Sequence, residues 1–283
     1  MLLLLIVVPV LAGEPTIRVK TSSGIRKIGL ERYVLGVVSE EVYPDWPLET
    51  LKAQAVASRT YAIVRMREAR KAGRGWDVGS DTGHQVFSTK PVDPGSGVAQ
   101  AVRATKGEGV CYEGEPIEAV FHSNSGGETE DASVLWGKSV PYLRRVKSPW
   151  SAEGPNYFWT EDFDEGAFLK KLSGLGVRGS HVTEILAHGR EGSDRVDSLG
   201  IETDAGSYEV SGKDLRSALG ATVLRSLTFQ VRLEGGHVRI LGSGAGHGVG
   251  MCQWGARGLA LEGVGYRQIL STYYPGTDSC ELY

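Results

Sequence analysis

The feature that most constrains the fold of this 283-residue chain is a pair of helical patterns separated by a proline-containing break. From Leu30 to Glu41, apolar residues recur at the three- and four-residue spacing of one helix face. A second helix is predicted over about 47–72, with Pro47 in its first turn. The stretch "YPDWP" between them is short, so the two helices are expected to pack as an antiparallel hairpin.

The rest of the chain mixes short strands and helices. Residues 73–97 are rich in Gly, Ser and Asp and are predicted to form a long loop. A short helix and two strands are predicted next, the second strand ending at His122. Residues 160–236, approximately, have their own alternation of strands and helices and are expected to form an inserted mixed α/β subdomain. The predicted fold class is therefore α+β, with a single main domain over 17–277 that carries this insertion.

Composition narrows the function classes. The formal net charge is −3, which argues against nucleic acid as a partner because a phosphate backbone requires a basic surface. Apolar residues make up 41% and charged residues 23%, as in an ordinary globular protein.

The N-terminus carries the apolar run "MLLLLIVVPVLA", residues 1–12. It is shorter than the roughly 20 residues that a spanning helix needs. A signal peptide cleaved after Ala12 is predicted, although the usual basic residues before the apolar run are missing. The alternative is an uncleaved short membrane anchor, which would be the protein's sole link to a membrane. Either case predicts export to the cell envelope or periplasm.

Three cysteines, Cys111, Cys252 and Cys280, predict at most one disulfide and one free thiol, without indicating which two pair. A zinc site is a conceivable alternative, with Cys252 and His247 close in sequence and with Cys111 and His122 as further ligands. These residues lack zinc-finger spacing, so the expectation is that the protein holds no metal and no other cofactor.

Glu41 is the first catalytic candidate. It continues the apolar stripe of its helix and precedes a loop that carries Tyr43 and Trp46. Apolar and aromatic surroundings disfavour the charged carboxylate and raise its pKa, as a general acid for a glycosidic oxygen requires. Its neighbour Glu40 lies about 100° further round the helix and is expected to be exposed.

Two loops supply the candidate binding residues. The stretch "FHSNSGG" contains His122 and Ser125, but it lacks GxSxG and an acidic partner, so acyl transfer is discounted. The stretch "GHGVGMCQWGA" has neither the lysine of a phosphate-binding loop nor a surrounding βαβ unit. His247 and Gln253, with Trp254 nearby, suit the recognition of sugar hydroxyl and amide groups.

Six stretches in order resemble one known family. They are "VVSEEVYP", "LKAQAVASRTY", "SNSGGET", "PYLRRVKSP", "SGKDLRSALG" and "GHGVGMCQWGA". Together they are similar to the family of stage II sporulation protein D and the amidase enhancer domain. The resemblance extends from about Ile17 to Thr277.

This resemblance implies a lytic transglycosylase that cuts the MurNAc–GlcNAc bond of peptidoglycan glycan strands, favouring strands without stem peptides. It places the catalytic acid at Glu41, which would then act as a base while the muramyl 6-hydroxyl closes onto C1 to give a 1,6-anhydro end. Motif position and residue chemistry together suggest a second set of residues that hold substrate. That set comprises Arg59, His122, Ser125, His247 and Gln253.

The chain departs from the family pattern at Cys252, where serine is usual, at Trp254, where tyrosine is usual, and before Pro44. Two alternatives stay open. One is a wall-binding protein without activity of its own that enhances a cell-wall amidase. The other is a hydrolase that uses water and a second carboxylate, from Asp45, Glu128 or Asp131, and leaves reducing ends.

Overall fold

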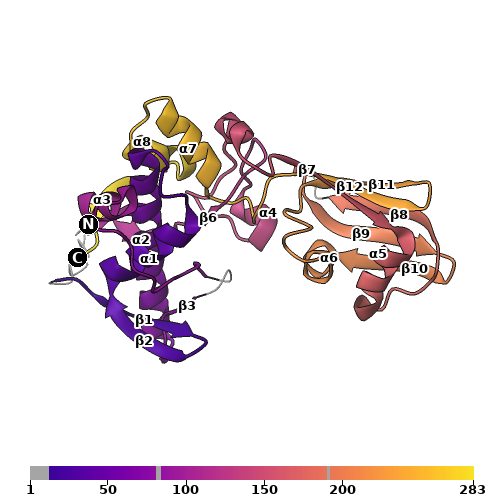
Figure 1. Cartoon of the computed structure of the whole chain (residues 1–283), viewed down its shortest axis with the longest axis horizontal. Helices are drawn as coiled ribbons and strands as arrows, with labels where there is room; N and C mark the ends of the chain where they lie inside the picture. The colour runs from indigo at the N-terminus through magenta and orange to yellow at the C-terminus, as the bar shows by residue number, and fades with distance from the viewer. Residues whose placement is uncertain (1–12, 81–83, 190–191) are drawn as a thin grey trace, which may run out of the picture. The chain divides into compact units, whose positions relative to one another are not determined.

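The two predicted helices form as α1 (Leu30–Glu41) and α2 (Leu48–Lys71), which pack against each other in the computed structural model (Figure 1). The stripe of α1 that includes Tyr33, Val34 and Val37 is buried. Residues 53–63 of α2 are all buried, so its middle is enclosed on every side. Small residues predominate there, and they let neighbouring segments approach the helix closely.

The structure describes residues 13–80, 84–189 and 192–283; the signal peptide or anchor predicted over 1–12 lies outside them. Contacts divide the chain into two compact units. Unit 1 comprises Met1–Val120 and Leu259–Tyr283, and unit 2 comprises Phe121–Gly258. The mixture of helices and small sheets confirms the α+β class.

Unit 1 surrounds the helix pair with two small sheets. The first has the order β2-β1-β3, and the second has the order β14-β4-β5. Their strands are β1 (Thr16–Thr21), β2 (Gly24–Gly29), β3 (Val78–Gly79), β4 (Glu108–Tyr112), β5 (Glu115–Pro116) and β14 (Asp278–Glu281). The helices α3 (Gly97–Ala104) and α8 (Tyr266–Tyr273) complete the unit. A disulfide joins Cys111 to Cys280, and Cys252 is free, which confirms one bridge and one thiol.

Among the described residues of the segment predicted as a long loop, 73–97, regular structure is limited to the two-residue strand β3 before α3 begins. Part of it nevertheless packs on α1. The ring of Phe87 stacks on Tyr33 with centroids 5.2 Å apart, and Tyr33 donates a hydrogen bond to the buried Gln85. Gly36 is required for this approach, since a side chain there would overlap the carbonyl of Ser88.

Unit 2 begins with irregular chain around two short parallel strands, β6 (Phe121–His122) and β13 (Met251–Cys252). The strand predicted to end at His122 is interrupted. Its two ends pair as β5 and β6, and the residues between them, 117–120, are not in a strand. Between these strands lie α4 (Ala132–Trp136) and the 3-10 helix η1 (Pro149–Glu153), and after β13 comes α7 (Gln253–Leu261).

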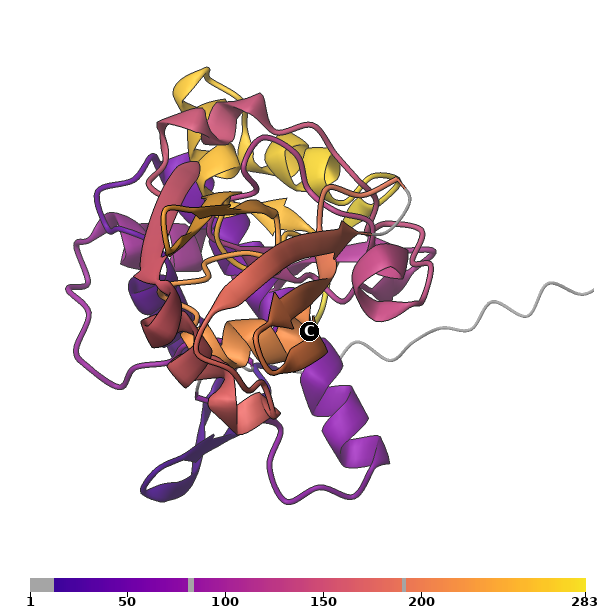
Figure 2. The same ribbon diagram turned by 90° about the vertical axis from the view of Figure 1, so that its right-hand side faces the viewer.

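The rest of unit 2 is a pair of three-stranded sheets with two helices, and Figure 2 shows the curvature of the strands. Their orders are β11-β12-β7 and β10-β9-β8. The elements are β7 (Phe158–Asp164), α5 (Glu165–Leu172), η2 (Ser173–Leu175), β8 (Val182–Gly189), β9 (Val196–Thr203), β10 (Gly206–Ser211), α6 (Gly212–Leu219), β11 (Phe229–Glu234) and β12 (His237–Ser243). One apolar cluster, which includes Phe168, Leu199 and Ile240, forms their common core. The insertion predicted over about 160–236 lies within unit 2, which starts earlier and ends later.

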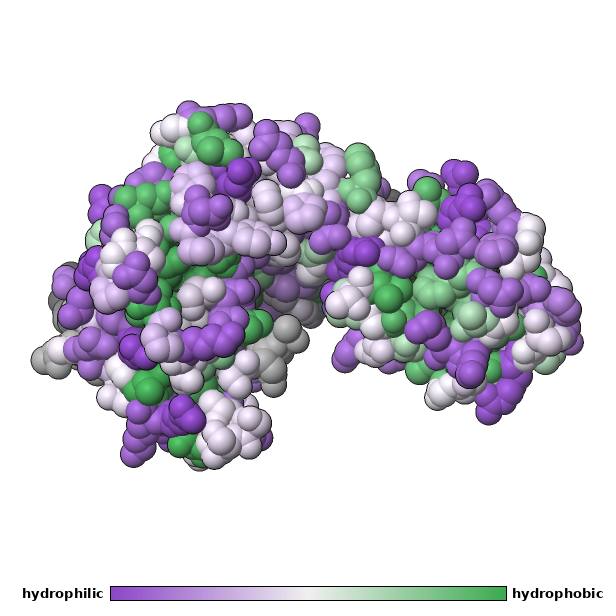
Figure 3. Space-filling view, in the orientation of Figure 1, coloured by the Kyte–Doolittle hydropathy of each residue, from purple (hydrophilic) through white to green (hydrophobic). Residues whose placement is uncertain are grey.

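On the face shown in Figure 3, hydrophilic side chains surround smaller apolar patches on both units. Within the described ranges, no helix combines the length and the apolar character that crossing a membrane requires.

Candidate functional site

Glu41 is the last residue of α1, and its side chain is partly exposed. Its Oε1 accepts a hydrogen bond of 2.9 Å from the backbone N–H of Val86, in the segment that packs along α1. Burial, and to a lesser extent the nearby Tyr61 and Glu41, raise the pKa of Tyr33 well above its usual range. Tyr33 therefore stays protonated and acts as a hydrogen-bond donor beside the carboxyl. Glu40 is exposed, as expected.

The loop after α1 places aromatic rings next to Glu41 in sequence. Tyr43 is 57% exposed, while Trp46 is only 8% exposed. Their ring centroids are 5.6 Å apart. The loop thus presents one accessible ring that is supported by a buried one, a surface suited to stacking against a sugar.

The side chain of Arg59 lies in the interior of unit 1. Its side chain is fully buried, with Nε and Nη2 donating to the carboxylate of Glu31 at 2.6 and 2.8 Å. Nη1 donates to the carbonyl oxygen of Glu108, and the hydroxyl of Tyr283 also contacts Glu31. Because its guanidinium is enclosed and bonded in this way, we leave Arg59 out of the binding surface proposed below.

The other four predicted binding residues, His122, Ser125, His247 and Gln253, belong to unit 2 and are described separately from Glu41. The rings of His122 and His247 lie 5.5 Å apart, centroid to centroid. His247 is held through both ring nitrogens, since Nε2 is 2.9 Å from the carbonyl oxygen of Phe121 and Nδ1 accepts from the N–H of Val249. His122 Nδ1 is 3.1 Å from the carbonyl oxygen of Val249.

The two imidazoles are neutral at physiological pH. Burial, followed by the proximity of His247 and Arg195, lowers the pKa of His122 well below its usual value. Burial, and then the charges of Arg195 and Arg216, lower the pKa of His247 to about 4. A neutral His122 whose Nδ1 carries the proton leaves Nε2 as an acceptor. Nε2 is buried and has no hydrogen-bond partner among the described residues.

Cys252, which stands where the family usually has serine, acts as a hydrogen-bond acceptor. Its Sγ accepts from the N–H groups of Ser125 at 3.2 Å and Gly255 at 3.3 Å. Burial raises the pKa of the thiol. The residue therefore fastens the "SNSGG" loop to the start of α7 as a neutral thiol.

Gln253, the first residue of α7, is 5% exposed. The ring of Trp254 packs closely against Gly154 and carries the guanidinium of Arg257 at 5.2 Å. Trp254 is thus engaged within unit 2, and a different tryptophan, Trp136, borders a cavity of this unit.

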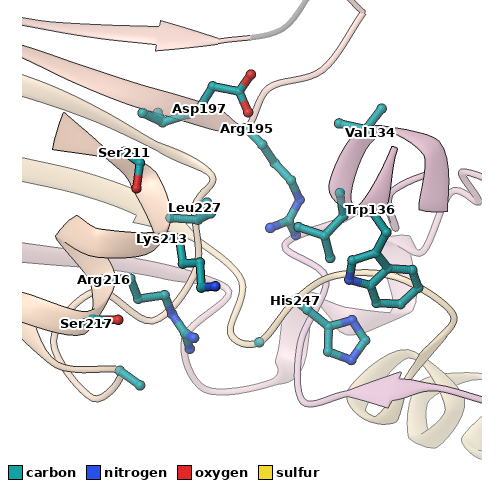
Figure 4. Close-up of a pocket in the computed structure, with 14 residues that line it drawn as sticks. Val134, Trp136, Arg195, Asp197, Ser211, Lys213, Arg216, Ser217, Leu227 and His247 are labelled. Atoms are coloured by element: carbon teal, nitrogen blue, oxygen red, sulfur yellow. The ribbon is translucent and has the colours of Figure 1, made fainter. Parts of the chain in front are cut away.

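That cavity has a volume of about 840 Å³ and includes His247 in its lining (Figure 4). Trp136, at the end of α4, is 46% exposed and lies 5.9 Å from the His247 ring. Arg195, Lys213 and Arg216 also line it. Trp136, Arg195, Lys213 and Arg216 were not among the predicted binding residues. The available signals were the "SGKDLRSALG" stretch, which contains Lys213 and Arg216, and a tryptophan shortly after the "SNSGGETE" loop.

Among the residues that the structure describes, no group of three or more His, Cys, Asp or Glu side chains is arranged to hold a metal ion. Zinc at Cys252 and His247 would have to displace hydrogen bonds, because both side chains are occupied by backbone groups. Asp131, one carboxylate considered for a hydrolase, caps α4 by accepting from the N–H of Ser133.

Comparison of the sequence with known proteins identifies the family. A family model described as "Stage II sporulation protein" matches residues 19–112, which include α1 and α2. Stage II sporulation protein D of Bacillus amyloliquefaciens is 37% identical over 95% of this chain and 82% of that protein. The protein of the same name from Bacillus subtilis (strain 168) is 34% identical over 92% of this chain and 77% of its own length. This chain therefore belongs to the family of stage II sporulation protein D.

A further relative is the amidase enhancer of Bacillus subtilis (strain 168), which is 30% identical over 86% of this chain. The match covers 39% of that protein, so more than half of the enhancer lies outside the match. The resemblance inferred from the motifs is confirmed for both names.

Proposed function

We propose that this protein is a lytic transglycosylase that cleaves the MurNAc–GlcNAc bond of peptidoglycan glycan strands, with Glu41 as the catalytic acid and base. The observation that carries the proposal is the placement of Glu41. Its carboxyl is partly exposed at the end of a helix whose apolar stripe is buried, is held by the N–H of Val86, and is followed by the Tyr43–Trp46 ring pair.

The reaction balances without water. Protonated Glu41 gives its proton to the glycosidic oxygen, and the bond from that oxygen to the muramyl C1 breaks. The resulting carboxylate then takes the proton of the muramyl 6-hydroxyl while O6 bonds to C1, which closes the 1,6-anhydro ring and restores protonated Glu41. Since the nucleophile belongs to the sugar, a single carboxyl serves both steps and no second one is required. The N–H of Val86 supports the carboxylate between them.

The same proposal covers the protein's compartment, its substrate and its partner. A disulfide between Cys111 and Cys280 is typical of an oxidising compartment, as expected for an exported protein of the cell envelope. Relatives named for sporulation and for amidase enhancement support a role in the cell wall. The substrate would be glycan strands whose stem peptides an amidase has removed, and that amidase is a candidate partner.

One other function is favoured by a specific observation. Because a relative bears the name amidase enhancer, the domain is also a candidate for a wall-binding protein that stimulates an amidase without cleaving glycan.

Digestion of purified glycan strands distinguishes the lytic transglycosylase from the amidase enhancer. Strands are first freed of stem peptides with an amidase, the amidase is removed, and the protein is added alone. Mass spectrometry of the products should detect 1,6-anhydro-muramyl ends. Reducing ends would indicate a hydrolase. No new ends, together with faster peptide release when the amidase is present, would establish the enhancer.

A further inference from the structure

One cavity of unit 2, the one lined by His247 and Trp136, has a cationic lining. Its volume, about 840 Å³, lies within the range of small-molecule sites. Three cationic side chains line it, Arg195, Lys213 and Arg216, against a single carboxylate, Asp197, among the described lining residues. The lining also includes apolar groups, such as Val134 and Leu227. Such a mixture suits a ligand that combines negative charge with apolar surface.

Arg195 gives the strongest indication of a ligand. Arg195 as a whole is 8% exposed, and its Nη1 is buried without a hydrogen-bond partner among the described residues. Its nearest carboxylate, Glu130, is 3.9 Å from Nε and is already bonded to Arg145 at 2.7 Å and to Ser193 at 2.5 Å. A buried guanidinium whose charge is incompletely paired is costly, and an anion in the cavity that Arg195 lines would reduce that cost.

The chain makes room for this arginine. Gly248, in the "GHGVG" stretch, has φ +79, and a Cβ at that position would overlap the guanidinium of Arg195. Arg216 is held in turn by the carbonyl oxygens of Leu224 and Arg225. Backbone carbonyl groups therefore hold Arg216, and the glycine leaves space for Arg195, while the side chain of Lys213 is exposed.

The opposite wall is aromatic. Figure 4 shows Lys213 and Arg216 on one side of the pocket and Trp136 with His247 on the other. The planar imidazole of His247 contributes a flat surface beside the partly exposed indole. An aromatic face of this kind stacks against a sugar ring.

We propose that this pocket binds an acidic sugar residue of the glycan strand, with its carboxylate on Arg195 and Lys213 and its ring against Trp136. In peptidoglycan the residue with this chemistry is MurNAc, whose lactyl carboxylate is free once the stem peptide is gone. The choice of glycan as ligand depends on the proposed function, whereas the choice of a carboxylate-bearing ring depends on the lining alone. The lactyl and acetamido methyl groups match Val134 and Leu227.

The test is a binding titration on full-length Glu41→Gln protein, so that no cleavage takes place. The probes are short peptide-free glycan strands with lactyl carboxylates either free or converted to methyl amides, and inorganic phosphate as a separate anion. We expect Lys213→Gln and Trp136→Ala each to weaken binding of the acidic strands by about tenfold, and methyl amidation to weaken it similarly. Both positions are exposed, so these variants should fold. The matched control is Lys171→Gln on α5, an exposed lysine outside the pocket that should leave affinity unchanged.

Equal affinity for amidated and acidic strands would overturn the proposal, as would unchanged affinity in Lys213→Gln and Trp136→Ala. Phosphate that binds as tightly as the acidic strands, and is lost in Lys213→Gln, would mark a phosphate site instead. The experiments distinguish a failure of the proposed cleavage activity from a failure of the proposed carboxylate-binding pocket. Carboxylate-dependent binding with no anhydro ends from wild type would remove the activity and retain the pocket, and the reverse result would remove the pocket alone.

Discussion

The backbone N–H of Val86 lies 2.9 Å from Oε1 of Glu41, which ties a glycine- and serine-rich segment to the end of α1. The same segment stacks Phe87 on Tyr33. The position of the proposed catalytic carboxyl thus depends on chain 45 residues further on.

Gly36 provides the first test of this dependence. In Gly36→Ala, the added methyl would overlap the carbonyl of Ser88 and the ring of Phe87, which should push the segment away from α1. We expect a loss of about 1–3 kcal/mol in the free energy of unfolding, together with a slower cleavage rate. Urea denaturation and glycan digestion measure the two effects. Gly75→Ala is the control, because nothing lies within 4 Å of its would-be Cβ. Equal stability and rate in both variants would contradict the account.

Arg59 should matter for stability. Arg59→Met leaves the carboxylate of Glu31 without its buried partner, and breaking such a pair costs about 3–5 kcal/mol. Arg67→Met, which removes an exposed pair with Glu115, should change the free energy of unfolding by less than about 1 kcal/mol. Glycan affinity of folded Arg59→Met protein should equal that of wild type. A stable variant with weakened affinity would restore Arg59 as a substrate-binding residue.

The cysteines should separate into two roles. Replacing Cys111 and Cys280 together by Ser removes the cross-link between β4 and β14 and should lower the free energy of unfolding by about 2–5 kcal/mol. Cys252→Ser keeps an acceptor for the N–H groups of Ser125 and Gly255, so it should cost less than about 1 kcal/mol. Cys252→Val removes that acceptor and should cost about 1–3 kcal/mol. If Val is tolerated as well as Ser, the thiol does not fasten the loop.

The histidine pair predicts a loss of stability in acid. An imidazole in the unfolded chain titrates near pH 6.5. Folding lowers the pKa of His247 to about 4 and lowers that of His122 as well. Between these values the unfolded state binds more protons, so the free energy of unfolding decreases as the pH falls from about 6.5 towards 4. His247→Asn should make this dependence shallower.

His181→Gln is the control for that experiment. Its contact with Glu165 raises the pKa of His181, so whatever it contributes is present at low pH and is lost as the pH rises. In His181→Gln, the free energy of unfolding should therefore still decrease as the pH falls from about 6.5 towards 4. Identical pH profiles for wild type and His247→Asn would contradict the buried, neutral imidazole.

Local patterns in the sequence predicted much of the fold. The helix pair is recovered within a residue at each end, and strands and helices do alternate within 160–236. Each of these depends on periodicity or turn chemistry within about ten residues, which is why the sequence carries the information.

Contacts between distant segments were not predictable in this way. Gln85 and Phe87 lie in a stretch whose composition indicates a loop, yet Gln85 is buried and the ring of Phe87 packs on α1, where Gly36 leaves room for it. The unit 2 cavity combines Trp136, Arg195 and His247 from three separate stretches. Only His247 stood in a recognisable motif. Arg59 is the converse case, because its motif position suggested substrate binding while Glu31, Glu108 and Val102 accept hydrogen bonds from its guanidinium, so its role in binding stays a prediction.

The central claim, that Glu41 is the acid and base of a glycan-cleaving reaction, is tested most directly by the rate at which anhydro-muramyl ends form. Wild type, Glu41→Gln and Glu40→Gln are compared on peptide-free glycan at equal concentration. Glu40 is the matched control because it is the adjacent, exposed glutamate on the same helix. The account predicts that Glu41→Gln lowers the rate by about 10²–10⁴ and that Glu40→Gln retains it. A Glu41→Gln protein that forms anhydro ends as fast as wild type would contradict it.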